Sequence, residues 1–145
     1  MKFRVLAALV IALGCASAPA LADTSIGAGL FFPSDGGATG GLLGSLPLIS
    51  LPLAPVSVQL SGAVPFSGGR YAVNAEAVVH AAGFFVGAGP GVGRFRDANG
   101  STGALYDILA GIRIAPMITL DARYYGSGSS NVGSATYAGL FFKLK

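Results

Sequence analysis

Apolar and polar side chains alternate residue by residue through most of the sequence that follows its first 22 residues. In the stretch 117–125, for example, Leu120 and Ala122 alternate with Asp121 and Arg123. A period of two is typical of β-strands, because successive side chains of a strand point to opposite faces of the sheet. The pattern therefore predicts an all-β chain.

The alternation divides into eight predicted strands, which are separated by stretches rich in Gly, Pro, Ser and Asn. The predicted strands occupy about residues 25–32, 42–50, 55–65, 70–81, 84–95, 103–114, 117–125 and 134–144. The odd-numbered connections are mostly longer than the even-numbered ones and span about residues 33–41, 67–69, 96–102 and 126–133. Membrane β-barrels show this alternation, with long external loops and short periplasmic turns. We therefore predict a closed, antiparallel, up-and-down transmembrane β-barrel of about eight strands.

The charged side chains of these strands fall on one face, and the opposite face is almost purely apolar. Only 10% of the residues are charged and 52% are hydrophobic, whereas a soluble surface needs roughly a quarter or more charged residues. The apolar face is therefore predicted to contact lipid and the charged face to line a narrow lumen. The predicted lumen charges are Arg70, Glu76, Asp107, Arg113, Asp121, Arg123 and Lys143. An alternative is a soluble exported lipid carrier, in which the apolar face would point inward.

Aromatic residues lie near the ends of the predicted apolar face. Phe32, Tyr71, Tyr106 and Tyr124 stand within a few residues of the longer connections, and Phe84 stands near the opposite rim, as does Phe142. Membrane barrels carry such aromatic girdles at both interfaces, and we predict that these residues form them.

Residues 1–22 have the order of a secretory signal, which divides the chain into a signal peptide and a barrel domain over residues 23–145. A short basic start precedes the uninterrupted apolar run 5–14, and Ala20-Leu21-Ala22 matches an A-x-A cleavage site. The run is too short for a spanning helix, which needs about 20 residues. Cleavage near Ala22 is expected to remove Cys15. Alternatively, Gly14-Cys15 distantly resembles a bacterial lipidation site, and either reaction sends the chain out of the cytoplasm.

The carboxyl-terminal stretch 137–144 carries a motif of its own. Tyr137 is followed two residues later by Gly139, and Phe142 and Leu144 lie three and five residues beyond that glycine. This spacing resembles the terminal signal of bacterial outer-membrane barrels, although here the last residue is Lys145 and not Phe. The whole chain resembles the small eight-stranded outer-membrane barrels. The resemblance implies residence in the outer membrane, contact with its lipids, and recognition by the barrel-assembly machinery.

Charge and residue counts exclude several classes of function. The nine basic and six acidic residues give a formal charge of +3, and loss of Lys2 and Arg4 with the signal leaves about +1. No basic stripe remains for nucleic acid. A single Cys and a single His predict neither a metal site nor a cofactor.

The run 87–93 is rich in glycine but lacks the spacing of a dinucleotide-binding loop. We expect its glycines to leave room for bulky lumen neighbours such as Tyr137 and Phe141. Pro90 cannot donate to a β-ladder and predicts a bulge. Pro47 lies in the predicted strand 42–50 and likewise cannot donate to a β-ladder.

An enzyme acting on outer-membrane lipids is the alternative function. Ser57 falls near His80 on the inward face if the third and fourth predicted strands pair, which would supply a nucleophile and a base. No acid is clearly positioned behind His80, so the pair is a weak catalytic candidate and the main expectation is a protein that is not an enzyme.

The principal prediction is a structural or surface-interaction protein that is a monomer. An eight-stranded barrel is too narrow for a solute channel, because side chains fill it. Its function would then depend on the external loops. Arg94, Arg96 and Asp97 are the predicted surface contacts, with anionic lipid headgroups as the expected partner.

Overall fold

The structure is a computed structural model and describes residues 24–51, 54–97 and 99–144. The predicted signal peptide and Cys15 lie outside the described residues. The strands are β1 (Ser25–Pro33), β2 (Thr39–Ser50), β3 (Val56–Pro65), β4 (Tyr71–Ala81), β5 (Phe84–Arg94), β6 (Gly103–Ala115), β7 (Ile118–Gly126) and β8 (Ala135–Lys143). Every predicted strand is present, and its ends lie within about three residues of the prediction. Among the described residues, no helix is long and apolar enough to cross a membrane.

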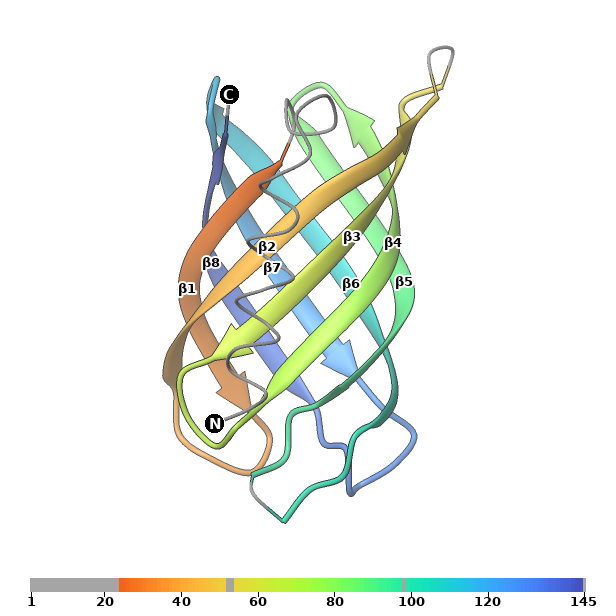
Figure 1. The fold of residues 1–145 in the computed structure, drawn as a ribbon. Helices are drawn as coiled ribbons and strands as arrows, with labels where there is room; N and C mark the ends of the chain where they lie inside the picture. Colours follow the sequence, from red (N-terminus) through yellow and green to blue (C-terminus); the bar gives the residue numbers. More distant parts are fainter. Residues whose placement is uncertain (1–23, 52–53, 98, 145) are drawn as a thin grey trace.

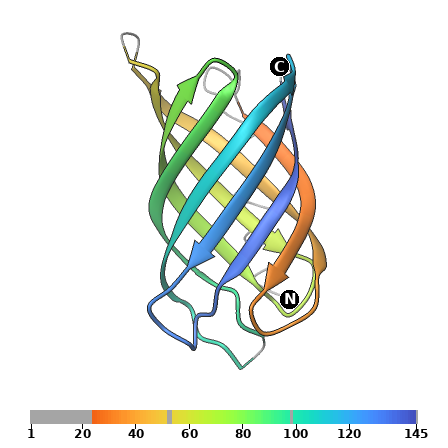
Figure 2. The ribbon, with the colours of Figure 1, turned by 180° about the vertical axis from the view of Figure 1, so that it is seen from behind.

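The eight strands form one closed barrel in which each strand pairs with the next in sequence order (Figures 1 and 2). β1 closes the barrel by pairing antiparallel with β8, from Ser25 opposite Lys143 to Pro33 opposite Ala135. Closure pairs both edges of every strand, which is the requirement for a sheet surrounded by lipid. The predicted up-and-down topology is confirmed.

The connections β2–β3, β4–β5 and β6–β7 lie at one end of the barrel, and the other four lie at the opposite end (Figure 1); the β2–β3 connection, residues 51–55, is longer than the predicted short turn. We call the end with the turns Ala82–Gly83 and Pro116–Met117 the turn end. We call the other end, with the connections 34–38, 66–70, 95–102 and 127–134, the loop end. The first loop is shorter than the predicted stretch 33–41, because Thr39 to Gly41 already pair with β1.

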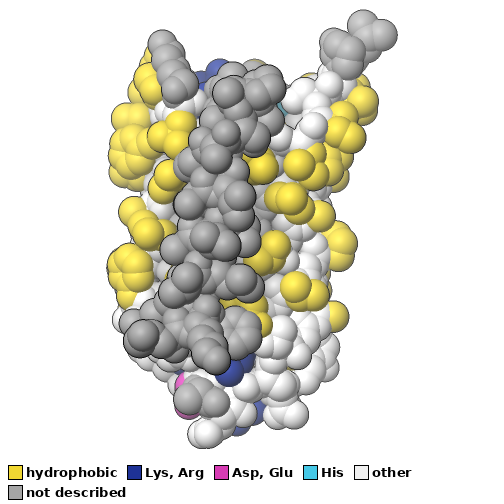
Figure 3. Space-filling view, viewed as in Figure 1, with side chains coloured by type: hydrophobic (Ala, Val, Ile, Leu, Met, Phe, Trp, Pro, Cys, Tyr) yellow, Lys and Arg dark blue, Asp and Glu magenta, His cyan; other side chains and the backbone are white. Residues whose placement is uncertain are grey.

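Large apolar side chains cover the outside of the barrel, and a smaller set of aromatic and aliphatic side chains is buried inside it. Phe84 is 60% exposed and Ile108 is 54% exposed, whereas Phe31 and Tyr137 are fully buried inside the barrel. Apolar side chains cover much of the outer wall in the face shown in Figure 3. The predicted assignment of faces is therefore confirmed.

The interior has three layers along the barrel axis. Aromatic side chains fill the layer nearest the loop end, where Phe31, Phe95, Tyr125 and Tyr137 stack or tilt against one another with centroids 4.7–6.5 Å apart. We call these four residues the aromatic layer. Charged residues fill the middle, and a polar cavity occupies the turn end.

The bulge predicted at Pro90 is absent. Pro90 lies opposite Tyr106 in unbroken register with β6. Its pairing with β4 is interrupted between Asn74 and Ala77, but the register is the same on both sides of the gap. Proline lacks an N–H and so removes hydrogen bonds to the neighbouring strand, but no extra residue is inserted here. The strand therefore keeps its register through Pro90. The register shifts lie elsewhere: in β2, between Pro47 and Ile49, and in β6, between Arg113 and Ala115.

The inward glycines of β5 have a different role from the predicted one. A Cβ added to Gly89 would lie 1.8 Å from the backbone oxygen of Ala75 on the neighbouring strand. Gly89 therefore permits a close approach of β4 to β5. Glycines on other strands make room for large lumen side chains, among them Gly27, beside the Phe141 ring, Gly41, beside the Phe31 ring, and Gly139, beside the Tyr137 hydroxyl.

Candidate functional site in the barrel interior and loops

The seven predicted lumen charges do not form one network. Arg70 lies at the loop end, and Arg113 and Lys143 lie at the turn end. The remaining four, Glu76, Asp107, Asp121 and Arg123, form the central cluster and are buried. Separation along the barrel axis explains the difference, because alternation predicts which face a residue lies on and says nothing about its height.

The central cluster places one guanidinium among three carboxylates. Arg123 Nη1 donates to Glu76 Oε1 at 2.5 Å and to Asp107 Oδ2 at 3.4 Å, and Nε donates to Asp121 Oδ2 at 3.0 Å. The cluster is assembled from β4, β6 and β7, which all project these residues inward at mid-strand. These hydrogen-bonded charged side chains fill the middle of the lumen.

Two neutral residues of β3 complete the surroundings of Glu76. Gln59 Nε2 donates to Glu76 Oε2 at 2.6 Å, and the Ser61 hydroxyl donates to Oε1. Both were missed as partners, although the alternation already put them on the inward face. Among the described residues, no group of three or more His, Cys, Asp or Glu is arranged to hold a metal ion.

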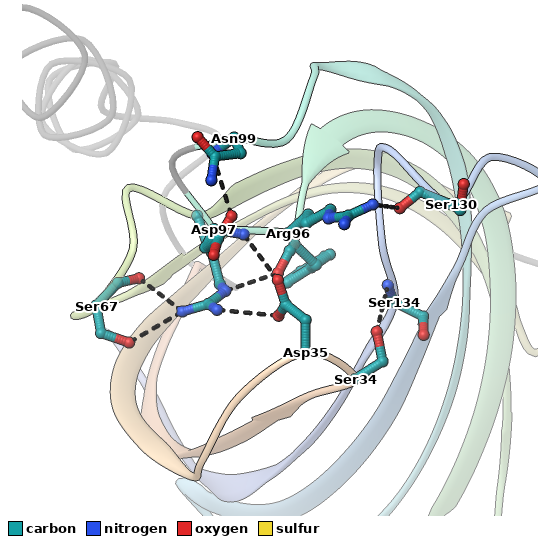
Figure 4. Close-up of polar contacts among 10 residues, drawn as sticks. Ser34, Asp35, Ser67, Arg96, Asp97, Asn99, Ser130 and Ser134 are labelled. Atoms are coloured by element: carbon teal, nitrogen blue, oxygen red, sulfur yellow. Dashed lines mark hydrogen bonds and ion pairs between the residues drawn. The ribbon is translucent and has the colours of Figure 1, made fainter.

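Polar contacts join the loops at the loop end (Figure 4), and Arg70 contributes to them from the end of the loop 66–70. Its Nη2 donates to Asp35 Oδ1 at 3.0 Å, and its Nε donates to the Phe95 carbonyl oxygen at 2.6 Å. The other carboxylate oxygen of Asp35 accepts the Asp97 backbone N–H at 2.9 Å. Three loops, 34–38, 66–70 and 95–102, are thus joined through Asp35, which carried no recognisable sequence signal.

These contacts shift the pKa of Asp35. Burial alone would raise it, but the hydrogen bonds from the Asp97 N–H and from Arg70, together with the Arg70 charge, outweigh burial and hold the pKa below its ordinary value of 3.8. Asp35 therefore stays ionised, and the tie persists, at neutral pH.

Of the predicted surface contacts, Arg96 and Asp97 lie in the connection 95–102, and Arg94 is the last residue of β5. Arg94 donates to the carbonyl oxygens of Gly69 and Gly100, and Arg96 donates to that of Ser130. Carbonyl oxygens carry no net charge, so each guanidinium is fixed in position while its positive charge is not neutralised by these bonds. The loop end therefore carries two positively charged guanidinium groups whose positions are fixed by hydrogen bonds to backbone carbonyl oxygens.

The predicted girdle residues all lie on the outer wall. Phe32, Tyr106 and Tyr124 lie at the loop-end rim and are between 43% and 47% exposed. Tyr71 begins β4 at the same rim, and its hydroxyl is hydrogen-bonded to that of Thr102 at 2.5 Å. Phe84 and Phe142 lie at the turn-end rim. Phe66, 62% exposed beside the loop-end rim, was missed because it follows a strand and belongs to no alternation.

The two weak catalytic candidates meet as the pairing of β3 with β4 suggested. A hydrogen bond of 3.0 Å joins Ser57 Oγ to His80 Nε2. The charged groups that act on His80 are cations, Arg113 and Lys143. Since a nucleophilic triad needs a carboxylate behind the imidazole, the described residues supply a hydrogen-bonded pair and not a triad.

The residues of the predicted assembly signal lie on the closing strand. Gly139 pairs with Gly29 of β1, and Phe142 points outward next to the turn end. The Leu144 N–H donates to the Thr24 carbonyl oxygen at 2.8 Å. Their recognition by an assembly machinery stays a prediction.

Taken together, the fold is a closed eight-stranded barrel that is apolar outside and polar or aromatic inside. This is the architecture of small outer-membrane barrels, so the resemblance stated from the sequence is confirmed for the fold. Several solved structures are similar in fold. The de novo designed protein TMB2.3 has a TM-score of 0.56 at 12% identity, covering 89% of this chain and 99% of its own.

Two others are bacterial proteins. Ail, the attachment invasion locus protein of Yersinia pestis, has a TM-score of 0.53 at 19% identity, covering 83% of this chain and 95% of its own. Neisserial surface protein A has a TM-score of 0.50 at 16% identity, covering 84% and 95%. No protein-family model matches the sequence, and no curated protein matches it either. At these identities the likeness establishes the fold alone.

Proposed function

We propose that the protein is a bacterial outer-membrane β-barrel that acts through its loop end. The observation that carries this proposal is the reversed polarity of the barrel, with apolar side chains outside and buried ions inside. A soluble barrel of this kind would expose a continuous apolar wall to water, which favours aggregation. An apolar outer surface of this kind is stable in contact with lipid.

The dimensions of the barrel support the same proposal. Its strands have 9 to 13 residues, and a tilted strand needs about 9–11 residues to span a bilayer. Aromatic side chains at both rims match the girdles at membrane interfaces. Export depends on cleavage near Ala22, and insertion depends on the terminal signal around Gly139.

Fractionation of the expressing cells tests the location. We expect the protein in the outer membrane and a band that migrates differently before and after boiling, because a closed barrel resists detergent unfolding. Release as a soluble periplasmic protein without this shift would contradict the proposal. A soluble lipid carrier would also need an apolar interior, which the buried central cluster does not provide.

We propose that the loop end contacts anionic groups at the cell surface, with the phosphates of outer-leaflet lipid headgroups as the partner. Arg94 and Arg96 support this role, because their guanidinium groups are held by carbonyl oxygens and keep their positive charge. Guanidinium groups favour phosphate and sulfate oxygens through paired hydrogen bonds. Ail was crystallised with a heparin analogue, sucrose octasulfate, which is a ligand of related chemistry.

The heat-modifiable transition provides a measurement of this contact. Lipopolysaccharide added to the protein in uncharged micelles is expected to raise the transition temperature, because it binds the folded state only. The double variant R94Q/R96Q should lose most of this increase, while R113Q, altered at the turn end, should keep it. An equal increase in all three proteins would contradict the proposal. Competition by a sulfated sugar would show that the site prefers a glycan.

The Ser57–His80 hydrogen bond is the one observation that favours a lipid-modifying enzyme. The pair faces the lumen at the turn end and is separated from the lipid-facing wall by the barrel itself. We therefore propose that the protein is not an enzyme and has no cofactor. We also propose a monomer that does not bind nucleic acid, since closure leaves no strand edge and the basic residues form no stripe.

A further inference from the structure

Arg94 is the one charged residue that the described strands present on the outer wall. It alternates in phase with Val86 and Val92, which are 56% and 53% exposed on that wall. Arg94 ends β5 at the loop-end rim, where the apolar wall meets the level of the lipid headgroups. The other charged residues of the described strands share the inward phase, namely Glu76, Asp107, Arg113, Asp121, Arg123 and Lys143.

Two aromatic residues accompany Arg94 at this rim. Tyr71 lies directly opposite Arg94 in the register of β4 with β5. Phe66 is 62% exposed and lies over Gly40, where an added Cβ would stand 3.3 Å from its ring. The turn between these two aromatic residues is bonded to Arg94, because Arg94 Nη2 donates to the Gly69 carbonyl oxygen at 2.9 Å. We call Phe66, Tyr71 and Arg94 the rim patch.

The Arg94 guanidinium keeps both its charge and hydrogen-bond donors for a ligand. Each terminal nitrogen carries two N–H groups, and the bonds to Gly69 and Gly100 use one on each nitrogen. Among the described residues, no carboxylate lies within ion-pair distance of Arg94. Arg70, by contrast, is buried and paired with Asp35 at 3.0 Å. Arg94 is thus half-buried at the rim with a positive charge that an anionic oxygen would complement.

The wall directly below the rim patch is apolar. Val73 of β4 pairs with Val92 of β5 two residues below Arg94, and these valines are 41% and 53% exposed. A lipid whose phosphate reached Arg94 would therefore lay its acyl chains along β4 and β5. Arg96 has no such wall beneath it, because it lies beyond the end of β5 and donates to the Ser130 carbonyl oxygen.

We propose that the rim patch seats one phosphate-bearing lipid of the surrounding leaflet, with its phosphate on Arg94 and its acyl chains on the outer face of β4 and β5. This inference rests on the proposed contact between the loop end and lipid phosphates, and it assigns that contact to one side of the barrel. The attraction between guanidinium and phosphate is stronger beside an apolar wall than in open water, because the local dielectric constant is lower. Aromatic side chains such as Phe66 and Tyr71 suit the headgroup level on either side of the phosphate.

Nuclear magnetic resonance of the refolded full-length mature chain in uncharged micelles tests the seat. The probe is phosphatidic acid that carries a nitroxide on one acyl chain, and diacylglycerol with the same label is its uncharged counterpart. Phosphatidic acid is expected to broaden the amide signals of Val73 and Val92 more than those of Leu30 and Ala138, by about fivefold, the preference that one basic side chain supplies at a membrane surface. Leu30 and Ala138 are the matched pair, since they face each other on β1 and β8 on the opposite side of the barrel. Diacylglycerol should broaden the two pairs equally.

Single variants separate this seat from general charge effects. R94Q should abolish the preference for β4 and β5, and R94K should keep part of it, since lysine keeps the charge without the guanidinium fork. R96Q removes the same charge two residues farther along the chain and should reduce the preference less, and R113Q at the turn end should leave it unchanged.

Two outcomes would overturn the seat while leaving the loop-end function in place. One is equal broadening of the two pairs by phosphatidic acid, and the other is a loss in R96Q that equals or exceeds the loss in R94Q. Failure of lipopolysaccharide to raise the transition temperature would instead overturn the loop-end function itself.

Discussion

Arg123 is the cation on which the middle of the barrel depends. Its guanidinium bonds to three buried carboxylates, those of Glu76, Asp107 and Asp121. A buried ion pair gains little over an apolar pair of the same shape, but removal of one partner leaves a buried charge without compensation. Arg123 is therefore expected to matter more for stability than any exposed arginine of this chain.

The substitution Arg123→Met tests this expectation, because methionine keeps much of the volume and removes the charge. We expect the free energy of unfolding to fall by about 3–5 kcal/mol, measured by urea titration of the refolded barrel in micelles. Arg113→Met is the matched control at an exposed position and should change it by less than about 1 kcal/mol. An equal fall in the free energy of unfolding of the two variants would mean that the ion pairs of the central cluster do not account for the effect of Arg123→Met.

Asp35 gives the loop end a pH dependence. Its pKa is depressed in the folded state, so its contribution to loop order is complete above the ordinary value near 3.8 and is lost as the pH falls through the lower, folded pKa. The amide proton of Asp97, which donates to Asp35, should report this titration with a midpoint below 3.8. In Asp35→Asn the same proton should not titrate in that range. A midpoint above 3.8 in the unaltered chain would contradict the assignment.

Single residues were predictable from the sequence where alternation alone decides their environment. The inward positions of Glu76, Asp107 and Arg123 follow directly from their apolar neighbours. The tie through Asp35 did not, because it joins loops that are far apart in sequence and obey no period. The proximity of Ser57 and His80 followed from strand pairing, since a hairpin brings residues at equal distances from its turn together.

At the scale of elements, period-two patterns and turn residues predicted all eight strands. Ala82 and Gly83 both have positive φ, at 47° and 91°, as a two-residue hairpin turn needs. Prediction from the sequence failed for the role of Gly89, because that role depends on how closely the backbone of the neighbouring strand approaches. Gly89 was assigned to lumen space, yet the contact that requires glycine there is with the backbone of Ala75.

β6 supplies a test of which solvent surrounds the barrel. Ile108 points outward near the middle of this strand and is 54% exposed. Ile108→Lys is expected to destabilise the barrel in lipid by about 2–4 kcal/mol, the cost of a lysine at the bilayer midplane. The measurement is reversible unfolding in lipid vesicles by urea.

The control for this variant is Ser101→Lys, which adds the same charge to an exposed loop residue. Its expected change is less than about 0.5 kcal/mol. Since a lysine on a soluble surface costs little, similar stabilities of Ile108→Lys and Ser101→Lys would contradict a lipid-facing wall.

At the scale of the whole molecule, the interior of the barrel is divided into three layers along its axis. The aromatic layer packs beneath the loops at the loop end, the central cluster fills the middle of the barrel, and the cavity lies at the turn end. The loop end and the cavity are thus separated by two filled layers. We expect that a ligand at one end has no aqueous path to the other, because side chains fill an eight-stranded barrel.

This separation predicts that the barrel does not conduct ions. In planar bilayers the folded protein should show no stepwise current, because side chains fill an eight-stranded barrel. A folded Tyr125→Ala variant should also remain silent, since the central cluster closes the lumen below the aromatic layer independently. Heat-modifiable migration verifies folding of both samples. Regular current steps in the variant alone would mean that the aromatic layer is the only barrier, and steps in the unaltered chain would mean that neither layer closes the lumen.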